Sequence, residues 1–392
     1  MKKKKVLVTF CEAGQGHIVT AEAIAESLER KYSNQIEVER KYVFRDSPIK
    51  ALQKYEQFAI NDVQRANKNK MHLRFQMLAM KIFGEQSSLN FVFSTVFGKV
   101  KKGLIEYYAS ENPDAIVSTY FATHHIACVA KKKGKITSQV IAYNPDHNTH
   151  GWWDRGGDMF ITNNPYATQE AIEKRHIDSS KVKTVNFITR SSVVNANESK
   201  EFYRKKYNLP LDKFTVVLAD GAYAKAKLDC FTKELLKTDL PITIIPICGK
   251  NQQLLDEYNQ LKSSVKPNIT FLPQPFVPSL PEICCASDLY ITKAGPNAIT
   301  DCVFMHTPIM TNFYSGNIEE ASNKLFTEVY KMGFYCPDKV EAKKKVEEFI
   351  LNPSLLDEYR QNTYKIDKNN NGADEIADLI AQSLGIEKST IS

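Results

Sequence analysis

Residues 289–301 read LYITKAGPNAITD. The opening apolar and β-branched residues predict a buried strand over Leu289–Thr292. Gly295-Pro296 then predicts a turn that opens a helix, because proline suits the first helical position and glycine lets the backbone approach a ligand closely. The free N–H groups of such a helix start attract an anion such as a phosphate. The stretch therefore predicts a strand, an anion-binding turn and a helix, the repeating unit of a parallel α/β sheet.

The same alternation of short apolar runs and helical periods extends over most of the chain. The strands predicted in the first half are Val6–Phe10, Glu37–Phe44, Ala115–Ser118, Gln139–Tyr143, Met159–Thr162 and Val182–Phe187. Those predicted in the second half are Phe214–Ala219, Ile242–Ile247, Ile269–Leu272, Leu289–Thr292, Ile309–Asn312 and Phe334–Tyr335. Two such series predict two doubly wound domains.

A chain of 392 residues is long enough for two domains. A polar stretch without periodicity, Thr189–Ser199, separates the two series of strands. We therefore predict an N-terminal domain over residues 1–192 and a C-terminal domain over residues 193–392. The last helices are expected to pack back toward the N-terminal domain.

The composition is that of a globular protein, with 43% apolar and 25% charged residues. The net charge of +7 allows nucleic acid, anionic membranes or phosphate-bearing ligands as partners and selects none of them. The eight cysteines lack the paired spacing of a zinc site, so we expect reduced thiols and no bound metal. No signal peptide or membrane-spanning run is recognisable. We therefore expect a cytoplasmic protein that binds peripherally to the cytoplasmic face of a membrane.

Residues 50–110 depart from the strand and helix rhythm and predict an insertion. Between Gln64 and Lys102 the only acidic residue is Glu85, and large apolar side chains are interleaved with basic ones. The basic residues there are Arg65, Lys68, Lys70, Arg74, Lys81, Lys99, Lys101 and Lys102. A helix with such faces binds in the plane of an anionic membrane. We favour this interpretation over a helix that packs on the sheet and keeps a solvated basic face.

A Gly-rich turn follows the first predicted strand, and a helix follows the turn. Its sequence, AGQGH at residues 13–17, is neither a Walker A loop nor the GxGxxG dinucleotide fingerprint. Gly14 and Gly16 let the backbone approach a polar ligand. His17 lies in the first turn of the helix, whose positive end favours the neutral imidazole that a general base requires.

A second polar cluster, NPDHNTHGWW at residues 144–153, follows the strand Gln139–Tyr143. Ligands of doubly wound folds bind beyond the carboxyl ends of the strands, which makes Asp146 and His150 candidates. Trp152 either offers an apolar surface for a sugar or an acyl chain or only fills the interior of the domain, and His124 is expected to face the same cleft.

Polar loops follow two further strands of the second half, as they follow Leu289–Thr292. Cys248-Gly249-Lys250-Asn251 follows one strand, and a loop containing Gly316, Glu319 and Glu320 follows the other. Three such loops at successive strand ends predict one nucleotide-sugar site.

These stretches resemble the glycosyltransferase family that contains monogalactosyldiacylglycerol synthase, the processive diacylglycerol glucosyltransferases and, more distantly, the lipid-linked N-acetylglucosaminyltransferase of peptidoglycan synthesis. The similarity runs from about Lys4 to Phe334, and CGKN at 248–251 and KAGPNAITD at 293–301 are its most specific parts. The resemblance implies a GT-B architecture, an α/β fold in which two doubly wound Rossmann-like domains face a central cleft. It further implies a UDP-sugar donor, a lipid acceptor such as diacylglycerol, inversion to a β-glycoside, and no cofactor or catalytic metal.

The resemblance also assigns roles to residues. His17 falls on the family histidine near the acceptor, Asp301 on the acidic residue that holds the ribose, and Gly295-Pro296 on the diphosphate-binding helix start. His17 and Asp146 are the predicted catalytic residues; either could be the base, or Asp146 could orient His17. The predicted donor-binding residues are Gly221, Gly249, Lys250, Asn251, Phe276, Val277, Lys293, Gly295, Pro296, Asn297, Asp301, Glu319, Glu320 and Asn323. The predicted acceptor-binding residues are Gly14, Gly16, His124, His150 and Trp152.

The chain departs from the family in the loop after Ile309–Asn312, which is two residues longer and has Glu319 where a sugar-reading glutamine is expected. The sequence therefore does not identify which sugar the donor carries. Two alternatives remain, a UDP-sugar 2-epimerase-like GT-B enzyme and a non-catalytic relative that binds a UDP-sugar or a lipid. A nucleic-acid partner is not expected, because the basic and aromatic residues fit no known module.

Overall fold

The computed structural model describes residues 2–12, 15–68, 86–221, 226–314 and 316–386. The chain divides into two compact units. Unit 1 contains Met1–Ile188 together with Asn371–Ser392, and unit 2 contains Thr189–Asn370. The sequence placed this boundary slightly later, after residue 192, because the polar stretch that begins at Thr189 carries no sign of belonging to the second unit.

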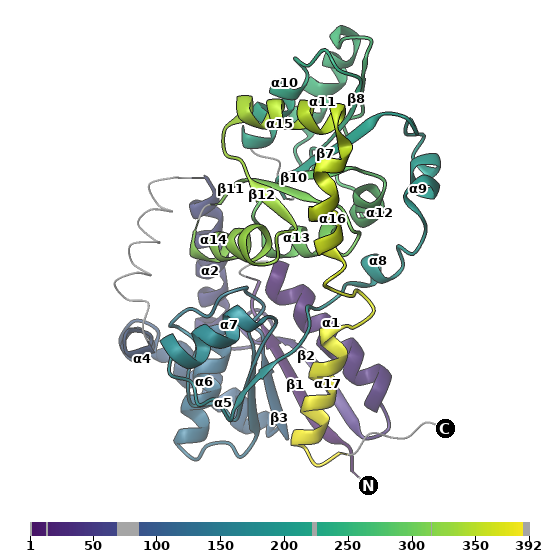
Figure 1. Ribbon diagram of the computed structural model, residues 1–392. Coiled ribbons are helices and arrows are strands. Elements are labelled where there is room, and N and C mark those ends of the chain that lie inside the picture. Colours follow the sequence, from purple (N-terminus) through teal and green to yellow (C-terminus); the bar gives the residue numbers. More distant parts are fainter. Residues whose placement is uncertain (1, 13–14, 69–85, 222–225, 315, 387–392) are drawn as a thin grey trace. The chain divides into compact units, whose positions relative to one another are not determined.

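Unit 1 is built on a parallel six-stranded sheet with the order β2-β1-β3-β4-β5-β6 (Figure 1). Its strands are β1 Lys4–Phe10, β2 Ile36–Tyr42, β3 Ala115–Ser118, β4 Gln139–Tyr143, β5 Met159–Thr162 and β6 Val182–Thr184. Its helices are α1 Gln15–Tyr32, α2 Lys50–Lys68, α4 Gln86–Thr95, α5 Gly98–Glu111, α6 Phe121–Lys132, α7 Pro165–Gln169, the π-helical turn Glu170–Lys174 and α17 Gly372–Ser383.

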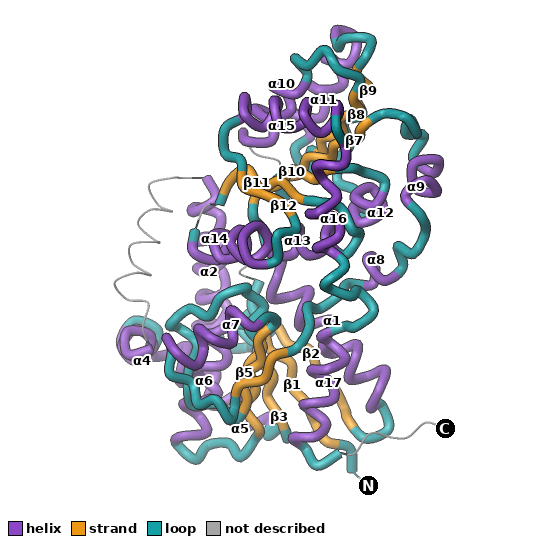
Figure 2. Tube along the Cα trace, in the orientation of Figure 1, coloured by secondary structure: helices purple, strands orange, loops and turns teal. Residues whose placement is uncertain are grey.

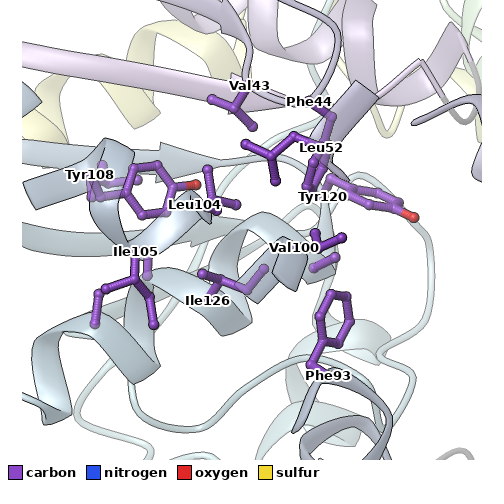
Figure 3. Packing of buried hydrophobic residues seen from close by; sticks show 14 of the residues in the cluster. Val43, Phe44, Leu52, Phe93, Val100, Leu104, Ile105, Tyr108, Tyr120 and Ile126 are labelled. Atoms are coloured by element: carbon purple, nitrogen blue, oxygen red, sulfur yellow. The ribbon is translucent and has the colours of Figure 1, made fainter. Parts of the chain in front are cut away.

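The strand β1 shows why helices cover both faces of this sheet. Val6 and Val8 point to one face, into a cluster that also holds buried residues of α1 and α17. Leu7, between them in sequence, points to the other face and joins a cluster formed with α2, α4, α5 and α6. Alternating side chains point to opposite faces of a strand, so an uninterrupted apolar strand needs a helical layer on each side. Figure 2 shows the strands of the sheet between these helices, and Figure 3 shows the packing of the second cluster.

Unit 2 repeats the architecture with a parallel sheet of order β12-β11-β10-β7-β8-β9. Its strands are β7 Phe214–Ala219, β8 Ile242–Ile247, β9 Ile269–Phe271, β10 Leu289–Lys293, β11 Ile309–Phe313 and β12 Gly333–Tyr335. Its helices are α8 Ser191–Val194, α9 Lys200–Lys206, α10 Ala226–Leu235, α11 Gln252–Leu261, α12 Leu280–Cys285, α13 Pro296–Val303, α14 Asn317–Lys324, α15 Lys339–Leu351 and α16 Asp357–Thr363. Shorter helical turns are Lys262–Ser264, Leu325–Val329 and Pro353–Leu356.

Each sheet has a switch point, where the chain leaves one side of its first strand and continues on the other. In unit 1 this point lies between β1 and β3, and in unit 2 between β7 and β10. Loops that leave the carboxyl ends of two such strands diverge and open a crevice, which is where doubly wound folds bind ligands. The fold therefore directs the search for a site to the residues after β1 and β3 and to those after β7 and β10.

All of the strands predicted from the sequence are confirmed, most of them within two residues of their ends. Within the described residues, no helix is both long and apolar enough to cross a membrane. Residues 69–85, which hold much of the predicted membrane-binding insertion, lie outside the described residues.

Candidate active site

His17 lies at the switch point of unit 1. It belongs to the first turn of α1, which follows β1, and its ring Nδ1 lies 2.7 Å from the main-chain oxygen of Thr119, which follows β3. The hydroxyl of Thr119 in turn donates to the main-chain oxygen of His17 at 2.9 Å. The two loops are therefore joined across the switch point by a pair of hydrogen bonds that fixes both the backbone and the ring of His17.

This contact determines the tautomer of His17. A carbonyl oxygen can only accept, so Nδ1 carries the proton and donates it to Thr119. The neutral ring then has its lone pair on Nε2, which has no hydrogen-bond partner among the described residues. Burial lowers the pKa of His17 below its ordinary value, although the bond to Thr119 opposes this shift. The ring is thus a neutral proton acceptor at physiological pH, as a general base requires.

The ring of His17 is oriented by Thr119, whereas orientation by Asp146 is one of the alternatives that the sequence leaves open. Asp146 was considered for that role, but the Thr119 carbonyl occupies Nδ1. Asp146 follows β4 and is nearly buried, and its side-chain Oδ2 lies 4.0 Å from Nε2 of His150. Burial raises the pKa of Asp146 to about 7, which leaves its carboxyl able to change charge near neutral pH.

His150 and Trp152 form an aromatic wall beside Asp146. The ring of His150 stacks on Trp153 with a centroid distance of 5.8 Å, and Trp152 packs against Phe121 at 5.1 Å. Burial lowers the pKa of His150 to about 3, so this ring is neutral. Of the other predicted acceptor residues, Gly14 lies outside the described residues, and the Gly16 carbonyl accepts a hydrogen bond from Thr20 at 2.8 Å within α1.

His124 does not have the position predicted for it. Its side chain is fully buried, and its ring Nε2 lies 3.1 Å from the main-chain oxygen of Asp154. An added Cβ at Gly157 would lie 2.7 Å from the His124 ring, which shows how tightly the ring is enclosed. His124 is therefore a core histidine with a satisfied ring nitrogen, and the predicted contact with an acceptor is not supported.

Lys293 occupies the switch point of unit 2. Its main-chain N–H donates to Asp220 after β7 at 3.2 Å, and its ammonium lies 2.6 Å from Oε1 of Glu319 on α14. A Cβ added at Gly221 or at Gly295 would each lie 3.8 Å from Cε of Lys293, so its stem passes between two glycines. Gly221 has a φ of +83°, a conformation that L side chains rarely adopt. The structure thus brings together predicted residues from three separate loops.

The N-terminus of helix α13 lies in the same region. Gly295 is its N-cap residue and Pro296 its first residue, and no side chain caps the helix. The N–H groups of this first turn, with Asn297 among them, are the donors that an anion would satisfy. Glu319 and Glu320 lie in the first turn of α14, where Gly316 is the N-cap residue. The region combines one lysine, two helix starts and carboxylates able to accept hydrogen bonds from hydroxyl groups.

The segment that contains Phe276 and Val277, two of the predicted donor-binding residues, lies beside the CGKN loop. Residues 247 and 274 form a parallel β-bridge, and the N–H of Cys248 donates to the oxygen of Gln274 at 2.7 Å. Phe276 and Val277 follow this bridge, and the ring of Phe276 is 56% exposed. Gly249 has a φ of +60° and the Lys250 side chain is exposed. Asn251 caps α11, because its side chain accepts from the N–H of Leu254 at 3.1 Å.

Two further predicted donor-binding residues, Asp301 and Asn323, also have protein partners. Asp301 is buried on α13, and its carboxylate pairs with the guanidinium of Arg190, whose Nε lies 3.0 Å from Oδ1. A ribose would have to share this carboxylate with Arg190 or displace it. Asn323 is also buried, and its side-chain oxygen accepts from the hydroxyl of Thr311. That bond connects α14 to β11, and the donor contact predicted for Asn323 stays a prediction.

Three residues of these regions were not predicted from the sequence. Thr119 acts through its main-chain oxygen, which no side-chain pattern reveals. Arg190 lies in the polar stretch that was interpreted as an interdomain break. Asp220 could have been found, because an acidic residue directly after a buried strand is a signal of the same kind as Asp146.

The chain matches two protein families over separate regions. Residues 17–186 match the family described as monogalactosyldiacylglycerol (MGDG) synthase, and residues 222–380 match the glycosyltransferase family 28 C-terminal domain. Among curated proteins, the chain is 23% identical over 384 residues to monogalactosyldiacylglycerol synthase 2, chloroplastic, of Arabidopsis thaliana, covering 93% of this chain and 78% of the relative. It is 25% identical over 388 residues to a probable monogalactosyldiacylglycerol synthase 2, chloroplastic, of Oryza sativa subsp. japonica, covering 93% and 77%.

Among solved structures, the chain is similar to MurG of Acinetobacter baumannii, with a TM-score of 0.64, 15% identity and coverage of 97% of this chain and 99% of that one. It is also similar to Anabaena HepE in complex with UDP, with a TM-score of 0.57, 12% identity and coverage of 98% and 100%. At these identities the similarity shows the fold, which is the GT-B fold of two parallel α/β sheets.

Proposed function

We propose that this chain, a glycosyltransferase with an MGDG synthase-type N-terminal region and a family 28-type C-terminal region, transfers a hexose from a UDP-sugar to a lipid hydroxyl. Diacylglycerol is the acceptor that we propose, and the product is a β-glycosyl lipid. The observation that carries the proposal is the His17–Thr119 contact at the switch point of unit 1, which presents a neutral histidine whose Nε2 has no hydrogen-bond partner within the described residues.

Unit 2 is proposed to hold the donor. Its switch-point region offers what a nucleotide diphosphate needs, namely an uncapped helix start at Gly295-Pro296, close backbone approach at Gly221, and the ammonium of Lys293. The exposed ring of Phe276 beside Gly249 supplies a surface for a base. HepE of Anabaena, which has the same fold, was solved with UDP.

Unit 1 is proposed to hold the acceptor and the base. The acceptor oxygen bonds to the anomeric carbon as its proton moves to Nε2 of His17, and the bond from that carbon to the diphosphate oxygen breaks with its electron pair leaving on UDP. Attack from the face opposite UDP inverts the configuration. Donors that are already oriented toward the departing diphosphate are usually the largest catalytic contribution, and here they are N–H groups and Lys293, so we propose that no metal is required.

A lipid acceptor requires contact with a membrane, and unit 1 has an exposed apolar surface suited to this. Phe58, Phe91 and Val96 are 53%, 67% and 71% exposed. Phe58 contacts Phe97 at a centroid distance of 5.6 Å, which links α2 to the end of α4. Lys99 and Lys102 follow on α5, so basic groups border the apolar ones. We call Phe58, Phe91, Val96 and Phe97 the apolar surface.

Serine at both Phe91 and Val96 is expected to weaken binding to vesicles that contain anionic lipid by at least about tenfold. Each exposed side chain gains about 1.5–3 kcal/mol on full burial, so even partial insertion of the two exceeds the 1.4 kcal/mol of a tenfold change. Sedimentation with sucrose-loaded vesicles measures the partition. Leu351→Ser is the matched control, because Leu351 is 74% exposed but belongs to unit 2. If the double variant and the control bound the vesicles equally, the apolar surface would not be the part of the protein that contacts the membrane.

The function itself is tested by release of UDP from UDP-glucose, UDP-galactose and UDP-N-acetylglucosamine, each with and without diacylglycerol in anionic vesicles. We expect release with one donor that depends on the lipid, with a glycolipid as product. Release without lipid would favour hydrolysis or the epimerase alternative. Measurable UDP binding with no release from any donor would favour the non-catalytic alternative.

A further inference from the structure

Glu56 of α2 is a buried carboxyl group that the proposed chemistry does not use. The residue is 3% exposed, and its Oε1 accepts a hydrogen bond from the main-chain N–H of Glu12 at 2.7 Å. Its Oε2 is enclosed and has no hydrogen-bond partner among the described residues. A carboxyl group is costly to bury, and an apolar side chain would fill the same space at less cost. The bond to Glu12 therefore indicates a role beyond packing.

Glu12 lies between the end of β1 and the beginning of α1, the helix that carries His17. β1 ends at Phe10, and the first turn of α1 contains His17. Glu56 holds the N–H of Glu12 on the strand side of this connection. Thr119 holds the ring and the main-chain oxygen of His17 on the helix side, at 2.7 and 2.9 Å. The position of the His17 ring therefore depends on two anchors, and Glu56 is the one on the strand side.

The helix α2 is itself fixed against the other loop of the switch point. Tyr55, which precedes Glu56, packs on Phe44 with a centroid distance of 4.8 Å. Phe44 also contacts the ring of Tyr120 at 6.5 Å, and Tyr120 meets the ring of His17 edge-on at 5.2 Å. These aromatic contacts connect α2 to the loop after β3. A side chain on a packed helix can hold a loop more precisely than one on another loop can.

The contact between α2 and the residues after β1 has counterparts at two other candidate loops. Oε2 of the buried Glu170 accepts from the main-chain N–H of Thr149, in the loop after β4, at 3.0 Å. Asp220 accepts from the main-chain N–H of Lys293 at 3.2 Å. An N–H group near the end of a strand needs a partner beyond the sheet ladder, and a carboxyl group supplies it. Bonds to an ionised carboxylate are also the stronger ones, so they fix the loop firmly.

We propose that Glu56 is a positioning residue of the acceptor site, whose carboxyl group holds the main-chain N–H of Glu12 and thereby places the ring of His17 for proton transfer from the acceptor hydroxyl. A general base must lie within hydrogen-bond reach of the proton that it takes, so a small displacement of the ring costs activity. Glu56 acts through His17 and not on the substrate. The inference rests on the proposed function for this catalytic effect, but the effect of Glu56 on the His17 ring can be tested without turnover.

A matched contact at the opposite end of β1 separates this role from a contribution to stability alone. Oδ2 of Asp114 accepts from the main-chain N–H of Lys5 at 2.9 Å. This bond also joins a carboxylate to a main-chain N–H, but it lies at the amino end of β1, whereas His17 follows the carboxyl end. Alanine at either position removes such a bond. If Glu56 served stability alone, the two variants would behave alike.

The first measurement is kcat for lipid glycosylation, with the Kd for UDP measured beside it. We expect Glu56→Ala to lower kcat by about 10–100-fold, because the base is displaced, and to leave the Kd for UDP unchanged. Glu56→Gln should keep most of the activity, since its side-chain oxygen can still accept from Glu12. Asp114→Ala should keep the kcat of the wild-type protein. If Glu56→Ala does not fold, Glu56→Leu takes its place, because leucine fills the space and accepts no hydrogen bond.

The second measurement is independent of turnover. The bond to Thr119 protects the Nδ1 proton of His17 from exchange, so its signal is read by NMR with 15N-labelled histidine and identified by its absence in His17→Ala. We expect Glu56→Ala to shift or lose this signal, and Glu56→Gln and Asp114→Ala to keep it. That pattern supports the inference even if the wild-type protein transfers no sugar, in which case only the proposed function fails. An unchanged signal in Glu56→Ala, or an equal change in Glu56→Gln or Asp114→Ala, would overturn the role of Glu56.

Discussion

Alanine at position 17 is expected to lower kcat for lipid glycosylation by about 10²–10⁴-fold, while the Kd for UDP stays unchanged. The reason lies in the geometry of the ring. Nδ1 of His17 is committed to the Thr119 carbonyl at 2.7 Å, which leaves Nε2 as the only proton acceptor of the ring. Alanine removes the acceptor, but it leaves the backbone hydrogen bond from the Thr119 hydroxyl to the oxygen of residue 17 available.

The pH dependence of the wild-type protein separates His17 from Asp146. Burial lowers the pKa of His17 below the ordinary 6.5, so its base form persists at mildly acidic pH and is lost only as the pH falls through the lowered value. Burial raises the pKa of Asp146 to about 7, so an acidic limb near neutral pH belongs to the carboxylate and not to His17.

The matched control for position 17 is His176→Asn, which removes an exposed histidine of the same unit. His176 has a φ of +54°, and asparagine tolerates this conformation better than most residues. We expect it to retain full kcat. A variant at position 17 that loses UDP affinity as strongly as it loses kcat would place His17 with the donor, and the roles of the two units would have to be reassigned.

The sheets could be predicted because buried parallel strands leave a local signal. β3, β4, β5, β7 and β8 have the predicted bounds, since each is a short apolar run that ends in polar residues. β6 is shorter than predicted and ends at Thr184, because Val185 pairs only through an N–H bond to Thr162 at 2.9 Å. The boundary between the units could not be placed as well, since the ion pair that joins the side chain of Arg190 to Asp301 of unit 2 leaves no local signal in the sequence.

The sequence predicts which loops form the candidate site, but it does not predict which side chains contact one another there. The switch points follow from strand order, and the polar residues after β1, β4, β7 and β10 are the ones that the structure brings to them. His124 and His125 are both fully buried, and the residues that enclose His124, Gly157 and Asp154, are distant from it in sequence. The same holds for Asn323, whose amide bonds to Thr311 on another element. Residue type and spacing show what a loop could bind, but tertiary neighbours decide which side chains remain available.

After unit 2 the chain returns to unit 1 and forms helix α17. Ile376, Ala377, Ile380 and Ala381 of α17 are fully buried in the cluster that covers one face of the first sheet. Gly372 begins this helix, and a Cβ there would lie 1.9 Å from the main-chain oxygen of Asn186. That oxygen cannot move away easily, because the neighbouring N–H of Gly372 donates to Phe187 at 3.1 Å and Glu375 holds Asn186. The backbone of α17 can approach the sheet this closely only with glycine.

We therefore expect Gly372→Ala to lower the free energy of unfolding of unit 1 by about 3 kcal/mol, at the upper end of the usual overpacking cost. Helix propensity opposes this, since alanine is favoured over glycine by up to about 1 kcal/mol, but the backbone clash is the larger effect. Both tryptophans of the chain, Trp152 and Trp153, lie in unit 1, so denaturation followed by tryptophan fluorescence reports on this unit.

Gly98→Ala is a closely matched control, because Gly98 is also the first residue of a helix in unit 1 but has nothing within 4 Å of an added Cβ. There only the propensity difference remains, so we expect no loss of stability and a gain of up to about 1 kcal/mol. Opposite signs for the same substitution at two equivalent helix positions would isolate the contact with Asn186. If both variants were equally stable, the close approach of α17 to residue 186 would be wrong, and with it the assignment of the C-terminal helix to the core of unit 1.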